Sequence, residues 1–192
     1  PRWRGAAPIQ RAILAGDALL TMAFELCARA NAEHNLDAAR QVQLIRELAV
    51  GSGNIGMVGG QVLDIQAENK DIDLTTLQSI HKHKTGMLIR AAVRMGAITA
   101  GATPAQLDDL TFYAEQIGLA FQIADDVLNV TGTREELGKN PNTDAQRGKK
   151  TYPTFYGVEG AKQLAEECVT RANDRLASFG SKADPLRELA RY

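Results

Sequence analysis

Apolar residues recur with the 3.6-residue period of an α-helix through most of this chain, and no segment alternates apolar and polar residues like a strand. This pattern, or an Ala- and Leu-rich composition, predicts helices over residues 10–31, 37–50, 57–69, 74–100, 104–130, 158–179 and 185–190. Asp73 or Thr75 can cap the helix that starts near residue 74, and Thr103 precedes a proline suited to a first helical turn. The predicted fold class is all-α.

The composition narrows the class of protein. A length of 192 residues suits a single domain with a substantial core. The net charge of −1 and an aromatic content of 5% provide neither a polybasic surface nor many stacking platforms, so we expect no nucleic-acid partner. The most apolar segment, residues 12–24, contains Asp17 and is too short to span a bilayer. Cys27 and Cys168 lie in helix-like segments and lack CxxC spacing, which favours a reduced, cytoplasmic compartment. We also expect no stable membrane anchoring.

The stretch FQIADDVLN, Phe121–Asn129, puts two adjacent carboxylates into an apolar, helix-like run. At 100° per residue, Gln122, Asp125, Asp126 and Asn129 share one stripe of the helix. Short acids and amides suit the wall of a cavity, and such oxygen ligands can bind a hard cation such as Mg²⁺ together with substrate phosphates. A narrow solvated face or a local cap also explains such a pair, so the motif alone leaves both interpretations open.

Lys84 interrupts an apolar stripe that also contains Leu77 and Leu88. A buried ammonium would need an anion, and either a diphosphate or an aspartate from another helix could supply it. A side chain that snorkels along the helix is the alternative. Thr85 adds a hydroxyl group beside Lys84.

Other polar residues also stand in apolar helical stretches. We expect Asp17 to be structural and satisfied by a neighbouring donor. Gln61 and Asp64 stand at i and i+3 and can face the same interior, either as a hydrogen-bonded pair or as substrate contacts. His81 and His83 are two residues apart and point to different sides of a helix, which makes them a poor metal-binding pair.

Residues 131–153 form a polar segment, rich in Gly, Pro and Lys, between two helical regions. A connection of this length inside a compact helical domain is typical of a functional lid or a disordered insert. Its lysines include Lys139 and Lys149. A solvent-exposed run of charges without a specific role is one interpretation of them. A Lys-bearing loop that follows an acidic helix could equally close over a metal-bound phosphate.

Taken together, these segments resemble the trans-polyprenyl diphosphate synthases, and most closely the bacterial farnesyl diphosphate synthases. The matching blocks, in order, are ILAGDALLTMAFEL, GMVGGQVLDI, KTGMLIRAAVRMGA, GLAFQIADDVLNVTG and LGK…DAQRGKKTYP. The resemblance implies an all-α, isoprenoid-synthase-like helical bundle around a central cavity, usually as a homodimer. It also implies Mg²⁺-assisted ionisation of an allylic diphosphate (dimethylallyl or geranyl) and its condensation with isopentenyl diphosphate inside a cavity that shields the carbocation from water.

The resemblance assigns roles to individual residues. Asp125 and Asp126 would bind Mg²⁺ as the second aspartate-rich motif of the family. Lys84, Lys139 and Lys149 would contact the allylic diphosphate, whose departing charge they would stabilise.

Further positions carry over, and some depart from the family pattern. Thr85 and Gln122 would lie near the reacting carbons and offer dipoles to the developing positive charge, while Phe121 would help to wall the substrate pocket. Asn129 stands where the family has a third aspartate, and Asn142 where it often has glycine. The family's first aspartate-rich motif, DDxxD, does not occur in these 192 residues.

Two explanations of this departure compete. The chain is either one polyprenyl synthase domain, residues 1–192, that is incomplete at its N-terminus, or a short non-catalytic relative that binds and modulates an active partner. We favour the first because Lys84, Lys139, Lys149 and the aspartate pair all persist, and we expect little or no activity from this chain alone. A terpene cyclase fits the KTGML and GKKTYP blocks poorly. A purely structural helical dimer is the non-enzymatic alternative.

Overall fold

The computed structural model describes residues 8–34, 36–133, 144 and 148–192, and within these the chain is helical without a strand. The elements, in chain order, are α1 (Pro8–His34), α2 (Ala38–Ser52), α3 (Met57–Ala67), α4 (Leu74–His81), the π-helical segment η1 (Lys82–Gly86), α5 (Met87–Thr99), α6 (Pro104–Thr131), α9 (Tyr152–Arg175), the 3-10 segment η2 (Ala177–Ala183) and α10 (Asp184–Arg191). The predicted all-α class is therefore confirmed.

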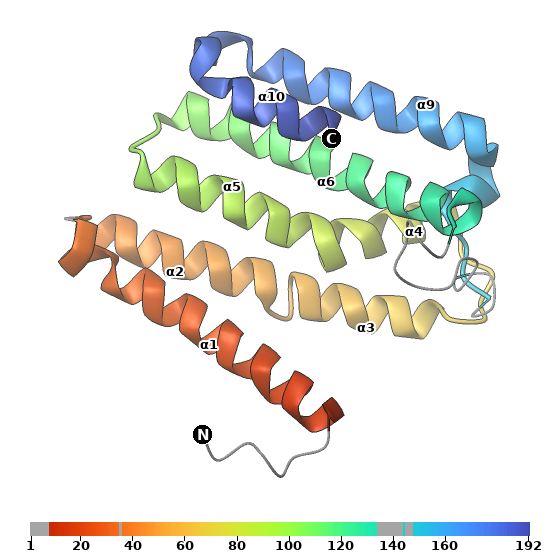
Figure 1. Ribbon diagram of the computed structural model, residues 1–192, viewed down its shortest axis with the longest axis horizontal. Helices are drawn as coiled ribbons and strands as arrows, with labels where there is room; N and C mark the ends of the chain where they lie inside the picture. Colours follow the sequence, from red (N-terminus) through yellow and green to blue (C-terminus); the bar gives the residue numbers. More distant parts are fainter. Residues whose placement is uncertain (1–7, 35, 134–143, 145–147) are drawn as a thin grey trace.

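The long helices pack in a simple order. Figure 1 shows α1 beside α2, with α5, α6 and α9 following in turn and α10 folded back at the C-terminal end. α3 continues beyond α2 and contacts η1, so the ends of α3 and α6 lie on the same side of the molecule as the start of α9. The candidate site lies at this end of the bundle.

Side chains fix the starts of several helices where the sequence predicts them. The Asp73 carboxylate accepts a hydrogen bond from the backbone N–H of Thr76, so Asp73 rather than Thr75 caps α4. Thr103 and Gln106 form a reciprocal capping box at the start of α6.

Two predicted helices differ from those observed. The helix expected over residues 74–100 is interrupted by η1, and the helix expected over 158–179 starts earlier, at Tyr152, and ends at Arg175. Gly157 has a φ of 69° inside α9, a left-handed conformation that glycine adopts without strain.

The buried core of the described chain consists of three clusters. One joins α4, α6 and α9 around Ile123, Tyr152 and Cys168. A second joins the other end of α6 to α9 and η2, and a third joins α1, α2 and α5 around Cys27. Because the two cysteines are free and belong to different clusters, they do not pair with each other.

α1 and α3 expose much of their apolar surface. The exposed large apolar residues of these helices are Ile9, Ile13, Leu14, Leu19, Leu20, Met22, Leu26, Val58, Val62, Leu63 and Ile65. Asp17 lies among them and is exposed, and no described residue donates a hydrogen bond to its carboxylate. The expectation of a satisfied, structural Asp17 is therefore wrong for the described chain. None of the described helices is long and apolar enough to cross a bilayer.

Candidate functional site

A polar cavity of about 70 Å³ lies where α3, α4, η1 and α6 meet the start of α9. Its polar lining residues are Asp64, His81, Lys84, Gln122, Asp125, Asp126, Asp144, Lys149, Lys150 and Thr151. Positive and negative side chains from segments far apart in the sequence therefore share one small space.

Lys84 and Thr85 lie in η1, a π-helical turn between α4 and α5. Two glycines let neighbouring backbones approach this turn. A Cβ atom at Gly60 would lie 2.1 Å from the backbone N of Lys84, and one at Gly118 would lie 3.1 Å from the Cα of Gly86. The turn is thus packed between α3 and α6. π-Helical turns inside α-helices occur frequently at functional sites.

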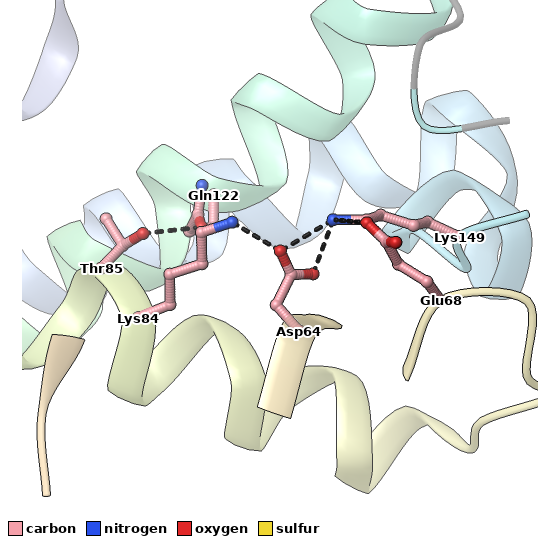
Figure 2. Close-up of polar contacts among 6 residues, drawn as sticks. All are labelled: Asp64, Glu68, Lys84, Thr85, Gln122 and Lys149. Atoms are coloured by element: carbon pink, nitrogen blue, oxygen red, sulfur yellow. Dashed lines mark hydrogen bonds and ion pairs between the residues drawn. The ribbon is translucent and has the colours of Figure 1, made fainter. Parts of the chain in front are cut away.

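Lys84, Lys149 and Asp64 form one compact group, which we call the lysine–aspartate cluster (Figure 2). The Lys84 Nζ donates to Asp64 Oδ2 at 2.6 Å. The Lys149 Nζ lies 2.8 Å from Oδ1 and 2.7 Å from Oδ2 of the same carboxylate. Burial alone would raise the pKa of Asp64, but the hydrogen bonds and the positive charges of Lys149 and Lys84 together outweigh burial and hold that pKa below its usual value.

This cluster contains one of the two anions that the sequence offers as partners for Lys84. In the described chain, the anion beside Lys84 is an aspartate from another helix, Asp64 of α3. Asp64 is 8% exposed, whereas Gln61 on the same helix is exposed, so the two do not face the same interior as expected. They sit one turn apart in α3, and Asp64 contacts Lys84 of η1.

Asp125 and Asp126, the acidic pair, line the same cavity from α6. Asp126 is 4% exposed, and its Oδ2 accepts a hydrogen bond from the backbone N–H of Tyr152 at 2.9 Å. Burial raises the pKa of Asp126 to about 7; the Tyr152 hydrogen bond opposes this shift. The nearby carboxylates of Asp144, Asp125 and Asp64 contribute to the rise.

Gln122 is held in place by Thr85. The Thr85 hydroxyl donates to Gln122 Oε1 at 2.9 Å, which links η1 to α6 across the cavity (Figure 2). A carbonyl oxygen has two lone pairs, so Gln122 Oε1 can accept this bond and still direct negative partial charge into the cavity.

The donor set of the acidic pair fits Mg²⁺ in part. Carboxylate oxygens are the ligands that Mg²⁺ prefers, and the raised pKa of Asp126 marks a carboxylate that is short of nearby positive charge. Within the described residues, no group of three or more His, Cys, Asp or Glu side chains could hold a metal ion. Mg²⁺ bound here would therefore take its remaining ligands from water or from a phosphate.

The structure brings most of the predicted site residues together. Lys84, Gln122, Lys149 and the acidic pair all line the cavity, and Thr85 is bonded to one of them. Phe121 is 57% exposed and is not among the residues that line this cavity. Lys139 lies outside the described residues.

Some residues of the cavity carried no clear sequence signal. His81 falls on the same helical stripe as Leu77 and Lys84, which could have indicated it. Burial lowers the pKa of His81 to about 4, so the ring is neutral at pH 7. The Tyr152 N–H that binds Asp126 is a backbone group, which no side-chain pattern reveals.

The side chain of Asn129, which stands where a third aspartate was expected, is buried. It is 1% exposed, and its Oδ1 accepts a hydrogen bond from the backbone N–H of Asp144 at 3.5 Å. Asn129 therefore joins the end of α6 to the segment in which Asp144 lies. Asp144 itself lines the cavity with the acidic pair.

Comparison with known proteins is consistent with this arrangement. The sequence pattern of the polyprenyl synthetase family matches residues 2–180. The chain is 46% identical over 185 residues to the farnesyl diphosphate synthase of Escherichia coli (strain K12), a match that covers 94% of this chain and 62% of that protein. It is 45% identical over 182 residues to the geranylgeranyl diphosphate synthase of Cyanophora paradoxa, covering 94% of this chain and 60% of that protein.

A solved structure is also similar. The geranyltransferase of Helicobacter pylori, crystallised with magnesium and isoprenyl diphosphate, matches with a TM-score of 0.76 and 33% identity over 92% of this chain and 57% of that chain. The chain thus spans about three fifths of the length of these relatives. Sequence and fold agree over nearly all of the chain, which therefore belongs to the polyprenyl synthetase family.

Proposed function

We propose that this chain supplies the diphosphate-binding part of a short-chain prenyltransferase of the farnesyl diphosphate synthase type. The reaction would join isopentenyl diphosphate to an allylic diphosphate by ionisation, condensation and proton elimination. The observation that carries the proposal is a single cavity with two lysine ammonium groups on one side and two aspartates on the other. This combination suits an anion that arrives with a divalent cation.

Each side of the cavity has a distinct task in this proposal. Mg²⁺, when bound by Asp125 and Asp126 and by diphosphate oxygens, would act as a Lewis acid that stabilises the leaving group. Lys84 and Lys149 bind the diphosphate and neutralise the charge that develops as its bond to carbon breaks. Lys139 is assigned the same role from the family resemblance alone.

Thr85 and Gln122 act on the other product of ionisation, the allylic carbocation. The Thr85 hydroxyl fixes the orientation of Gln122 Oε1 before any substrate binds, so no reorganisation is needed during the reaction. Phe121, the residue before Gln122 in α6, is proposed as an apolar wall for the prenyl chain. The farnesyl product is our proposal from the bacterial relative, and a geranylgeranyl product is the alternative that the Cyanophora relative suggests.

We also propose that the protein works as a homodimer. The exposed apolar residues of α1 and α3 support this, because an extended apolar face usually marks a protein–protein interface. A role as a non-catalytic subunit that binds an active partner would use the same face. Because these residues contain no DDxxD motif, we expect little or no condensation of isopentenyl and dimethylallyl diphosphates by the 192 residues alone.

The test is binding of geranyl thiolodiphosphate, an unreactive allylic analogue, measured by calorimetry with and without Mg²⁺. We expect Mg²⁺-dependent binding that weakens about ten- to a hundredfold in Lys84→Ala and Asp125→Ala, because each removes a charge-assisted contact. Lys162→Ala is the control, since Lys162 forms an exposed ion pair with Glu159 on α9. Equal affinity for the analogue in the wild type and all variants, or an affinity that does not depend on Mg²⁺, would contradict the proposed function.

A further inference from the structure

Both described lysines that are assigned to the diphosphate already bind a single carboxylate. Lys149 contacts both oxygens of Asp64, and Lys84 contacts Oδ2 (Figure 2). We propose that Asp64 is a positioning residue that acts as an internal anion: it holds the two ammonium groups together before diphosphate binds and competes with diphosphate for them. This inference rests on the proposed function and deepens it.

The geometry explains why an internal anion is needed. Lys84 comes from η1 and Lys149 from the segment before α9, yet both ammonium groups lie within 2.8 Å of one carboxylate. The Lys149 side chain is only 14% exposed, so water cannot screen its charge well. Without Asp64, the two ammonium groups would face each other with only the more distant and more exposed Glu68 carboxylate beside Lys149, which is costly.

The same geometry makes Asp64 a competitor. An ammonium group has three N–H donors. Lys149 donates to both oxygens of Asp64 and Lys84 donates to one of them, so the bound diphosphate must use the remaining N–H groups or displace the carboxylate. In either case, the negative charge of Asp64 stays close to the diphosphate oxygens and repels them.

Such competition would suit a prenyltransferase. The enzyme has to release inorganic pyrophosphate after every condensation, and tight ground-state binding of a diphosphate does not lower the barrier to ionisation. An anion that returns to the lysines as pyrophosphate leaves would favour release. An ordinary structural ion pair between α3 and η1 makes no such contribution.

The decisive variant is Asp64→Asn, which keeps the shape and one carbonyl acceptor for a lysine but removes the charge. The probe is inorganic pyrophosphate with Mg²⁺, titrated calorimetrically into the full 192-residue chain. We expect at least tenfold tighter binding than in the wild type, about 1.4 kcal/mol. Damage to the fold does not tighten binding. A gain in pyrophosphate affinity would therefore show that Asp64 competes with the ligand and does not act only as a structural ion pair.

Glu68→Gln is the matched control. The Glu68 carboxylate lies 3.8 Å from the same Lys149 Nζ but is more exposed than Asp64, so its loss should change pyrophosphate affinity less than twofold. If the wild type binds pyrophosphate and Asp64→Asn binds it equally or more weakly, the inference is overturned and the proposed function stands. Absence of Mg²⁺-dependent pyrophosphate binding in both proteins would overturn the proposed function as well.

A second measurement on the wild type does not depend on how the variant folds. Resonances of the lysine side-chain ammonium groups should shift for Lys84 and Lys149, but not for the control Lys162, as pyrophosphate is added. Unchanged Lys84 and Lys149 signals at saturation would show that diphosphate does not share these donors and would overturn the inference.

Discussion

Asp64 and Asp126 line the same cavity and both have little exposed surface, yet their pKa values are shifted in opposite directions. The pKa of Asp64 is lowered because two lysines donate to its carboxylate. The pKa of Asp126 is raised to about 7 because burial dominates and its charged neighbours are other carboxylates. The charged partners of the two carboxylates therefore differ in sign: lysines surround Asp64, and other carboxylates lie near Asp126.

The comparison shows which side of the cavity the protein balances by itself. In the lysine–aspartate cluster, Lys84 and Lys149 contact the Asp64 carboxylate, and the Glu68 carboxylate lies 3.8 Å from the Lys149 Nζ. On the side of the acidic pair, the described contact to Asp126 is a neutral backbone N–H. A divalent cation at the acidic pair would supply the positive charge that Asp126 lacks.

The largest expected effect on stability comes from removing a lysine of the lysine–aspartate cluster. Lys149→Met should lower the free energy of unfolding by about 3 kcal/mol, because it leaves Asp64 buried with one cation fewer. Urea denaturation at pH 7 measures this. Lys150→Met is the control: Lys150 pairs with the exposed Asp71, and its loss should cost less than about 1 kcal/mol. Equal losses in the two variants would mean that the cluster is an ordinary surface pair.

The next effect tests the opposite signs directly. The folded-state pKa of Asp126 lies above its unfolded value of 3.8, so its contribution to stability is present below pH 4 and is lost as pH rises toward about 7. Asp126→Asn should therefore raise the free energy of unfolding at pH 8 by about 2 kcal/mol and leave it nearly unchanged at pH 4.

Asp64→Asn serves as the contrasting variant in the same experiment. The pKa of Asp64 is lowered, so its stabilising contribution is present above the unfolded value and is lost as pH falls through the folded value. Its replacement should destabilise the protein at pH 8. Thermal denaturation of both variants across pH 4–8 measures the two trends, and changes of the same sign at pH 8 would refute the comparison.

The smallest expected effect concerns Asn129. Asn129→Asp keeps an acceptor for the N–H of Asp144 but adds a buried negative charge near the acidic pair. Without Mg²⁺, the free energy of unfolding at pH 8 should fall by about 1 kcal/mol, as measured by urea denaturation. Addition of Mg²⁺ and pyrophosphate should recover part of this loss. A variant as stable as the wild type in both conditions would show that a charge at position 129 does not interact measurably with the acidic pair.

Much of this arrangement could be predicted from the sequence because it depends on helical spacing. The stripe that contains Gln122, Asp125 and Asp126 follows from 100° per residue, and the apolar neighbours of Lys84 indicated that it needed an anion. Family resemblance added Lys149. The identity of the anion, Asp64, could not be chosen because two interpretations fitted the residues equally.

The rest depends on contacts between distant segments. The interruption of the helix at η1 goes with glycines at positions 60 and 118, which belong to other helices. The hydrogen bond that orients Asp126 comes from a backbone N–H 26 residues later in the chain. Spacing within one helix carries no information on either contact.

The close approach of Gly60 to the backbone of Lys84 has a consequence for how variants of this protein are interpreted. A single methyl group at position 60 would push the segment that carries the lysine out of place. Such a variant would lose ligand affinity and resemble an enzyme with a damaged reactive group, although every charged side chain was intact. Intolerance to substitution at that position would report on architecture, not on chemistry.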